Sequence, residues 1–150
     1  MNNIKQLLFL ACLSFIEKRH LTIKKQIEEI EISLSSETKS SAGDKHETGR
    51  AMLQLEREKA GQQLVEIEKT KQDILKIDPN LTSKNIRLGS LVFTSKFNYF
   101  IAISAGEIII KNDLFYAISS QTPIGQLLIG KTIGDIIYFR SEAITIINVI

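Results

Sequence analysis

The chain has 150 residues, enough for one ordinary domain or for an elongated module beside a small one. Hydrophobic residues make up 43% and charged residues 24%, a balance that excludes a disordered chain. The net charge of +2 is too small to indicate nucleic-acid binding by itself. Cys12 is the only cysteine and there are two histidines, which excludes an intramolecular disulfide and makes a four-ligand zinc site unexpected.

An apolar run, Leu7 to Leu13, follows Lys5 and contains the tripeptide Leu-Ala-Cys. A signal peptide or lipoprotein anchor is one reading of this run. The positive charge before it is a single lysine, and the apolar pattern continues into heptads without a break, so we expect a cytoplasmic protein. The run is also too short to span a bilayer. Residues 1–12 therefore fit either a helix or a targeting signal.

Residues 1–36 contain neither proline nor glycine, and their apolar positions repeat at alternating spacings of three and four. This spacing predicts one helix of a coiled coil. The positions are Leu13, Ile16, His20, Ile23, Ile27, Ile30 and Leu34. His20 lies on the seam, where we expect a packed histidine that sets the register rather than a ligand or a base.

A small, turn-prone stretch follows at residues 35–43, and a second heptad pattern then begins. Its positions are Leu53, Arg57, Ala60, Leu64, Ile67, Lys71 and Ile74. The two seams match in length, which favours an antiparallel hairpin within one chain over a coiled coil between chains. In that hairpin Leu34 faces Leu53, Ile27 faces Ala60 and His20 faces Ile67.

Pro79 ends the second helical pattern because it has no amide hydrogen to donate. Short β-branched and aromatic runs follow, separated by turn residues, and they predict a compact β domain. The runs are residues 91–94, 99–103, 107–110, 114–118, 136–139 and 143–147. One helical turn interrupts them, with Thr122 as N-cap, Pro123 at the first position and Gly130 as the stop.

These patterns predict an α+β protein with two domains. Residues 1–78 form an antiparallel coiled-coil hairpin whose tip lies at 38–48, and residues 79–150 form an antiparallel β domain with one short helix. A hairpin arm of about 30 residues at a rise of ~1.5 Å per residue spans roughly 45 Å.

Two stretches resemble the bacterial Gre transcript-cleavage factors. The first is Gly43-Asp44-Lys45-His46-Glu47, which is similar to the Gly-Asp and following Glu at the tip of that family's hairpin. The second, residues 118–135, resembles the family's Ser-Pro-(Leu/Ile)-Gly…Gly-Lys…Gly-Asp block, with Thr122 in place of the serine. The domain order and chain length also match, and with them the resemblance covers most of the chain.

This resemblance implies an FKBP-like C-terminal domain and a factor that binds RNA polymerase through its secondary channel. It implies that Asp44 and Glu47 at the tip share Mg²⁺ with the polymerase and stimulate its own cleavage of backtracked RNA, so the chain itself is not an enzyme. It also implies a monomer whose partners are the polymerase and the nascent RNA 3′ end, with no membrane. Expected contacts with polymerase or RNA are Lys39, Lys45, Arg50 and Arg57, and expected docking residues in the C-terminal domain are Pro123, Ile124, Gly125 and Gly130.

The tip departs from the family pattern after Glu47. Cleavage factors continue with Asn-Ala-(Glu/Asp)-Tyr, whereas this chain continues with Thr48-Gly49-Arg50-Ala51. A regulator of the same shape that binds polymerase without cleaving RNA is therefore an alternative, and a coiled-coil adaptor is a third. The acids have a structural alternative too, because Asp44 at an N-cap with Glu47 three residues later is a capping-box arrangement.

Overall fold

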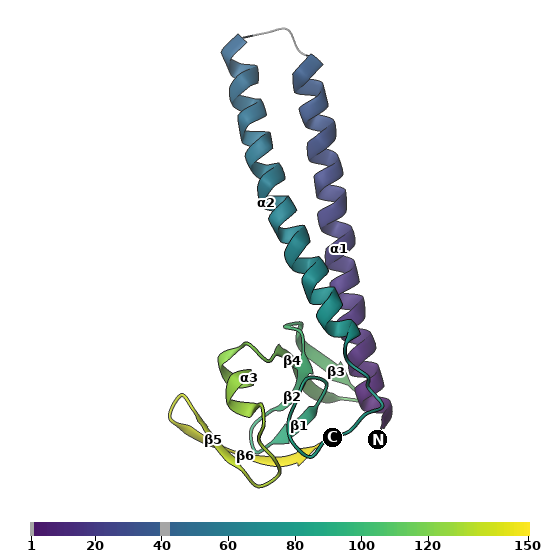
Figure 1. The fold of residues 1–150 in the computed structure, drawn as a ribbon, viewed down its shortest axis with the longest axis vertical. Coiled ribbons are helices and arrows are strands. Elements are labelled where there is room, and N and C mark those ends of the chain that lie inside the picture. The colour runs from purple at the N-terminus through teal and green to yellow at the C-terminus, as the bar shows by residue number, and fades with distance from the viewer. Residues whose placement is uncertain (1, 40–42) are drawn as a thin grey trace. The chain divides into compact units, whose positions relative to one another are not determined.

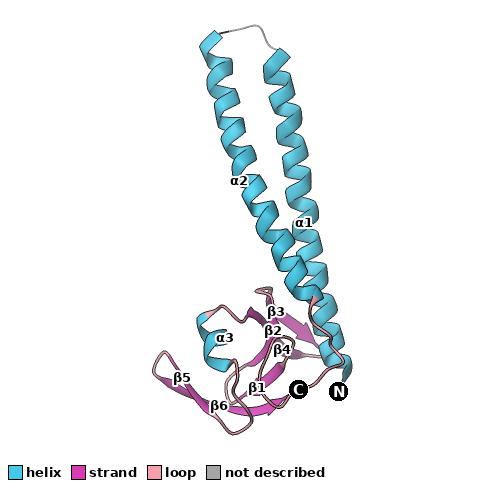
Figure 2. Cartoon of the chain, in the orientation of Figure 1, coloured by secondary structure: helices cyan, strands magenta, loops and turns pink. Residues whose placement is uncertain are grey.

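The structure is a computed structural model that describes residues 2–39 and 43–150, and side chains within residues 3–36 and 47–150 (Figure 1). It contains two long helices followed by six strands and one short helix, so the predicted α+β class is confirmed (Figure 2). The elements are α1 (Asn2–Lys39), α2 (Gly43–Leu75), β1 (Leu91–Thr94), β2 (Asn98–Ala102), β3 (Gly106–Ile110), β4 (Asp113–Ser119), α3 (Pro123–Leu128), β5 (Ile136–Phe139) and β6 (Glu142–Val149).

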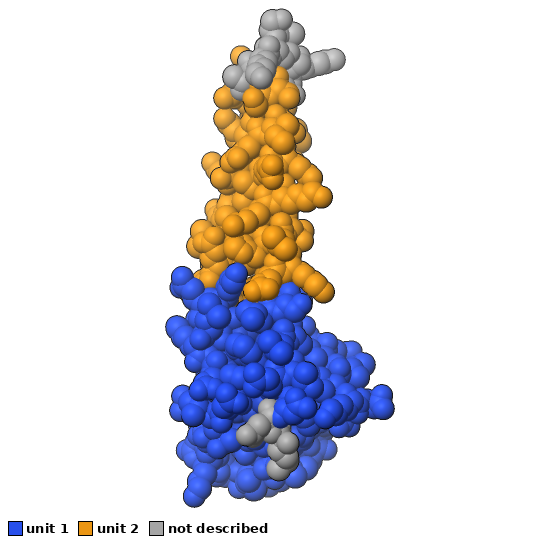
Figure 3. Space-filling model, turned by 90° about the vertical axis from the view of Figure 1, so that its right-hand side faces the viewer, with its two compact units in different colours: residues 1–15, 71–150 blue, residues 16–70 orange. Residues whose placement is uncertain are grey.

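The chain divides into two compact units (Figure 3). Unit 1 comprises Met1–Phe15 and Lys71–Ile150, and unit 2 comprises Ile16–Thr70. Both long helices therefore contribute residues to both units. The sequence boundary between residues 78 and 79 falls in the link between α2 and β1, where helical structure has ended. As a domain boundary it stays a prediction.

Unit 2 is an antiparallel pair formed by the α1 and α2 segments, which run side by side (Figure 1). The predicted seam positions within this unit are all buried or half-buried. The most buried are Ile16, Ile23, Ile27, Ile30, Ala60 and Ile67. The heptad seam and its folding back within one chain are thus confirmed.

Two polar contacts across unit 2 report the register of the pair. His20 Nε2 lies 3.7 Å from Glu68 Oε1, and Glu68 directly follows Ile67, the residue expected opposite His20. Arg57 Nε donates to Glu31 Oε1 at 3.2 Å, between the other two expected pairs of the seam. The register deduced from apolar spacing is therefore the observed one.

His20 is a polar interruption of this apolar seam. Its side chain is 17% exposed, and Nε2 has no hydrogen-bond partner among the described residues. At 3.7 Å the Glu68 carboxylate is too distant for a normal hydrogen bond. A buried polar atom in this state costs about 1–3 kcal/mol of stability.

Unit 1 contains a six-stranded sheet in the order β3-β4-β2-β1-β6-β5. All neighbouring strands are antiparallel except β2 and β4, which are parallel, so the expectation of an antiparallel sheet needs this correction. The exception arises because the chain skips one strand position between β2 and β3 and then returns through β4. The returning strand fills the vacant position in the same direction as β2.

The sheet buries side chains on both faces. One face packs with Ile124 and Leu128 of α3, and its cluster includes Val92, Tyr99, Ile101, Ile137, Ile144 and Ile146. The alternate residues Phe100, Phe115 and Ala117 point to the other face and are buried as well. Since these strands are covered on both sides, they read in the sequence as nearly continuous apolar runs.

The N-terminal residues 2–12 are helical, and Leu8 and Cys12 are fully buried in unit 1. No helix among the described residues is both long enough and apolar enough to span a membrane. Burial of the Cys12 side chain raises the pKa of its thiol to about 12. The thiol is therefore almost wholly protonated near neutral pH, as expected for an inert cysteine.

Cys12 is expected to resist alkylation in the folded protein. A rise of the thiol pKa from 9.0 to about 12 lowers the thiolate fraction at pH 8 by about a thousandfold, and burial blocks access further. Iodoacetamide labelling at pH 8, followed by mass spectrometry, should be slow in native buffer and fast in guanidinium chloride. Equal rates in the two solvents would contradict the burial.

His20→Leu is expected to stabilise the hairpin, because it replaces an unpartnered polar atom on the seam with an apolar side chain. The free energy of unfolding should rise by about 1–2 kcal/mol in thermal melts at pH 7. Lys18→Leu, at an exposed position on the same helix, serves as the control and should change it by less than ~0.5 kcal/mol. A lower melting temperature for His20→Leu would show that the histidine is required by the seam.

Candidate functional site

The two tip acids lie near the start of α2, which begins at Gly43. Asp44 and Glu47 are three residues apart on this helix, a spacing that places two positions on neighbouring turns. Glu47 is exposed, and its carboxylate has no hydrogen bond or ion pair with another described residue. The side chains of Asp44, Lys39 and Lys45 lie outside the described residues, so their expected roles stay predictions.

The start of α2 bears on the capping alternative for these acids. A capping box needs Asp44 to precede the first helical residue. The helix begins one residue earlier, at Gly43, which places Asp44 inside the first turn. The backbone therefore differs from the arrangement in which Asp44 is the N-cap.

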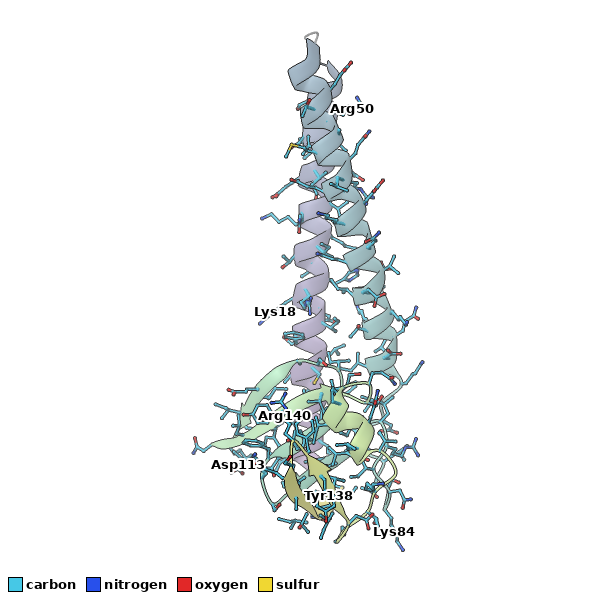
Figure 4. All side chains as sticks on the ribbon, turned by 90° about the vertical axis from the view of Figure 1, so that its left-hand side faces the viewer. Lys18, Arg50, Lys84, Asp113, Tyr138 and Arg140 are labelled. Atoms are coloured by element: carbon cyan, nitrogen blue, oxygen red, sulfur yellow. The ribbon has the colours of Figure 1, made fainter. Side chains whose placement is uncertain are left out.

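The two basic residues with described side chains near the tip differ in their surroundings. Arg57 is half-buried and donates to Glu31 across the hairpin, so it contributes to the pairing of the helices. Arg50 is exposed and projects from the ribbon of α2 (Figure 4). Contacts of either residue with polymerase or RNA stay predictions, and the hairpin itself accounts for Arg57.

The described residues contain no cluster of three or more His, Cys, Asp or Glu side chains that could hold a metal ion. Two carboxylates one helical turn apart can supply only part of a coordination shell. Mg²⁺ prefers hard oxygen ligands and commonly binds one or two carboxylates, with water and phosphate as the remaining ligands. A Mg²⁺ site at the tip acids would need further ligands from another molecule, and it stays a prediction.

The second stretch singled out in the sequence surrounds α3 in unit 1. Thr122 is its N-cap, and its Oγ1 accepts from Gly125 N at 3.1 Å and donates to Ser119 O at 2.8 Å. Both bonds use only the hydroxyl, which serine also carries. Thr122, which stands where the Gre factors have serine, therefore preserves the local structure.

Gly125 is required by a close approach of the backbone. A Cβ at this position would lie 2.4 Å from Ser119 O and 2.8 Å from Thr122 Oγ1, both too close for a carbon atom. Gly130 has a positive φ of +83°, which favours glycine where α3 ends. The predicted limits of this helix, Thr122 to Gly130, are thus confirmed.

The four expected docking residues all have structural roles. Pro123 opens α3, Ile124 is only 9% exposed in the core, and Gly125 and Gly130 are needed by the backbone. Their packing explains the residue types without a partner. Docking of polymerase at these positions stays a prediction.

A surface that the sequence did not single out lies beside α3. A pocket of about 380 Å³ opens there, and it is lined by Arg87, Leu88, Ser120, Gln121, Gln126 and Ile129. Leu127 and Ile129 are 37% and 39% exposed, large fractions for apolar side chains next to a core helix. Leu127 lies three residues after Ile124 and next to Leu128, on the helix face that this spacing predicts to be buried, so its exposure has no sequence signal.

Arg87 reaches this pocket through pairing that no local pattern reveals. Ile86 N donates to Lys131 O, and Gly130 N donates to Ile86 O, both at 2.8 Å. These two bonds hold the segment before β1 against the end of α3. The polar and apolar residues of the pocket are therefore brought together from segments more than 30 residues apart.

No protein-family model and no curated protein matches the sequence. Among solved structures, the chain is similar to the transcription factor Gfh1. The two share 16% sequence identity over 93% of each chain, with a TM-score of 0.36. A likeness at this level transfers no property to this chain.

Gly125→Ala is expected to destabilise unit 1, because its Cβ would force the 119–122 backbone to move. We expect a loss of about 1–3 kcal/mol in the free energy of unfolding, measured with urea. Gly61→Ala is the matched control, since its Cβ would meet only the flexible end of Arg57 inside α2. Gly61→Ala should leave the free energy of unfolding unchanged or raise it by up to ~1 kcal/mol. An equal loss of stability in both variants would contradict the close approach at Gly125.

Proposed function

We propose that this protein is a Gre-like transcription elongation factor that binds RNA polymerase as a monomer. In this proposal the turn between α1 and α2 enters the secondary channel, where Asp44 and Glu47 assist cleavage of backtracked RNA. The carrying observation is the register of unit 2, because the seam places Gly43 to Glu47 where the chain turns back. The resemblance of residues 43–47 and 118–135 to the motifs of that family supports the same reading.

The proposed role of the tip acids is to supply carboxylate oxygens to a Mg²⁺ shared with the polymerase. Glu47 is exposed and makes no bond with other described residues, so its carboxylate is available to an incoming ligand. Asp44 lies one turn before it on the same helix. Bound there, Mg²⁺ would supply stabilisation of charge on the attacking and leaving oxygens of the scissile phosphodiester.

The factor in this proposal holds the metal and the polymerase performs the hydrolysis, so the chain is not itself an enzyme. Its carboxylates would face the nascent RNA 3′ end only inside the complex. Unit 1 would dock on the polymerase through the surface around α3, where Leu127 and Ile129 are exposed beside the pocket that contains Arg87. No membrane has a role in this proposal.

A regulator that binds the secondary channel without cleaving RNA is the second candidate. It is favoured by the residues after Glu47, where Thr48 to Ala51 replace the acid and the aromatic residue of the cleavage factors. Thr48, Arg50 and Ala51 are exposed, so packing in a buried core does not dictate their identity. Their difference from the cleavage pattern would alter chemistry at the tip and leave binding intact.

Cleavage by a backtracked complex of the cognate polymerase separates the two candidates. With this protein and Mg²⁺ we expect the nascent RNA to shorten, and Asp44→Asn or Glu47→Gln should slow shortening by about a hundredfold or more because each removes a charged ligand. Glu58→Gln, an exposed acid farther along α2, is the matched control and should cleave as the unaltered chain does.

Binding of the unaltered chain and of the same variants to polymerase is measured in parallel. Binding of the unaltered chain without any RNA shortening would replace cleavage by the regulatory function. Absence of binding would reject both functions. RNA shortening that persists in the double variant Asp44→Asn, Glu47→Gln would reject only the proposed role of the two acids. Binding to polymerase and cleavage would remain.

A further inference from the structure

A small polar pocket of about 40 Å³ lies in unit 1 beside the segment that joins α2 to β1. Its polar lining includes three cationic side chains, one carboxylate and three hydroxyls, of which the Ser90 hydroxyl already accepts a hydrogen bond from Arg87 N. The other residues of this set are Lys5, Lys76, Arg87, Asp78, Thr82 and Ser83. The pocket therefore carries an excess of positive charge in a volume that suits one small ion.

Lys5 is the buried member of this set, with only 2% of its surface exposed. Its Nζ donates to Leu81 O at 2.6 Å and to Ile150 O at 3.3 Å. An ammonium group has three N–H donors, so one donor has no acceptor among the described residues. No Asp or Glu side chain among the described residues forms an ion pair with Lys5 within 4 Å, and its two hydrogen-bond acceptors are both backbone oxygens.

The surroundings of Lys5 lower the pKa of its ammonium group. Burial is the largest cause, and the nearby positive charge of Arg87 adds to it, while the Asp78 carboxylate opposes both. An isolated buried charge is costly unless it is paired. An anion placed between Lys5 and Arg87 would relieve this cost at the buried Lys5 and would also pair with the exposed Arg87.

Arg87 supplies the outer wall of the pocket. Its backbone N–H donates to Ser90 Oγ at 3.0 Å, which fixes the chain at this point. Its guanidinium group has no hydrogen bond or ion pair with the described part of the chain. The planar donor fork of arginine matches the oxygens of phosphate and carboxylate groups.

The remaining charged groups leave the pocket positive. Lys76 makes one exposed pair with Asp73 at 3.4 Å, which is a weak interaction in water. Asp78 accepts a hydrogen bond from Asn80 N at 2.9 Å through Oδ1, so part of its capacity is used within the loop. One side-chain carboxylate therefore lines the pocket with three cations, and two of these, Lys5 and Arg87, form no ion pair with an Asp or Glu side chain among the described residues.

We propose that this pocket binds a small tetrahedral oxyanion of the phosphate class. Lys5 would donate its third N–H from the floor, Arg87 would donate from the rim, and the hydroxyls of Thr82 and Ser83 would complete the shell. The volume admits one phosphate group but not a nucleoside. The anion is thus either free phosphate or a phosphate monoester whose remaining part stays outside the pocket.

Titration of the full chain with inorganic phosphate, followed by amide NMR at constant ionic strength, tests the site. We expect saturable shifts for residues 82–90, and Arg87→Gln should weaken binding by about tenfold or more. Arg87 is exposed, so this variant should fold normally. Lys84→Gln is the matched control, because Lys84 is in the same segment, does not line the pocket and projects away from the ribbon (Figure 4).

Phenyl phosphate in place of inorganic phosphate distinguishes the two sources of the anion. Binding of both supports a monoester, and binding of inorganic phosphate alone supports the free ion. Affinity should also fall as the pH rises toward 10.5, because Lys5 loses its proton below that ordinary value. Absence of saturable binding, or equal weakening by Lys84→Gln and Arg87→Gln, would overturn the proposal.

Discussion

The pairing of two apolar seams in unit 2 is the constraint on which the candidate site depends. Each buried isoleucine on this seam contributes about 1.5–3 kcal/mol, so a shift of one or two residues, which would turn several of them out of the seam, is strongly unfavourable. The link between α1 and α2 is also short, since α1 ends at Lys39 and α2 begins at Gly43. Together these two facts fix which residues occupy the turn, independently of what those residues do.

The sequence predicted this part of the fold because its signal is local and periodic. Heptad spacing identifies both the buried face and the register, so the proximity of His20 to Glu68 follows from counting along two helices. The limits of β1 and β5 were predicted to the residue, because turn residues flank short apolar runs on both sides. Alternation tells which face a side chain occupies but not which strand is its neighbour, and the parallel pair of β2 and β4 was therefore missed.

Lys5 shows the limit of local reasoning most clearly. In the sequence it is the single charge before an apolar run, where a lysine is ordinarily solvated. In the structure it is buried, because its acceptors Leu81 O and Ile150 O are 76 and 145 positions away in the chain. Arg87 reaches the end of α3 through backbone bonds to residues 130 and 131 in the same way. The two pockets described above depend on such distant contacts, which no local sequence pattern predicts.

The two motifs that resemble the Gre factors differ in what they demand of the fold. Thr122 and Gly125 are needed for a hydroxyl cap and a close backbone approach, so that motif would persist in a protein that only shared the domain. Glu47 is exposed and makes no bond with the other described residues, so the fold does not require a carboxylate there. The residues of the motif around α3 are therefore explained by the fold. The acids at the turn are not, so they are the stronger indication of a function.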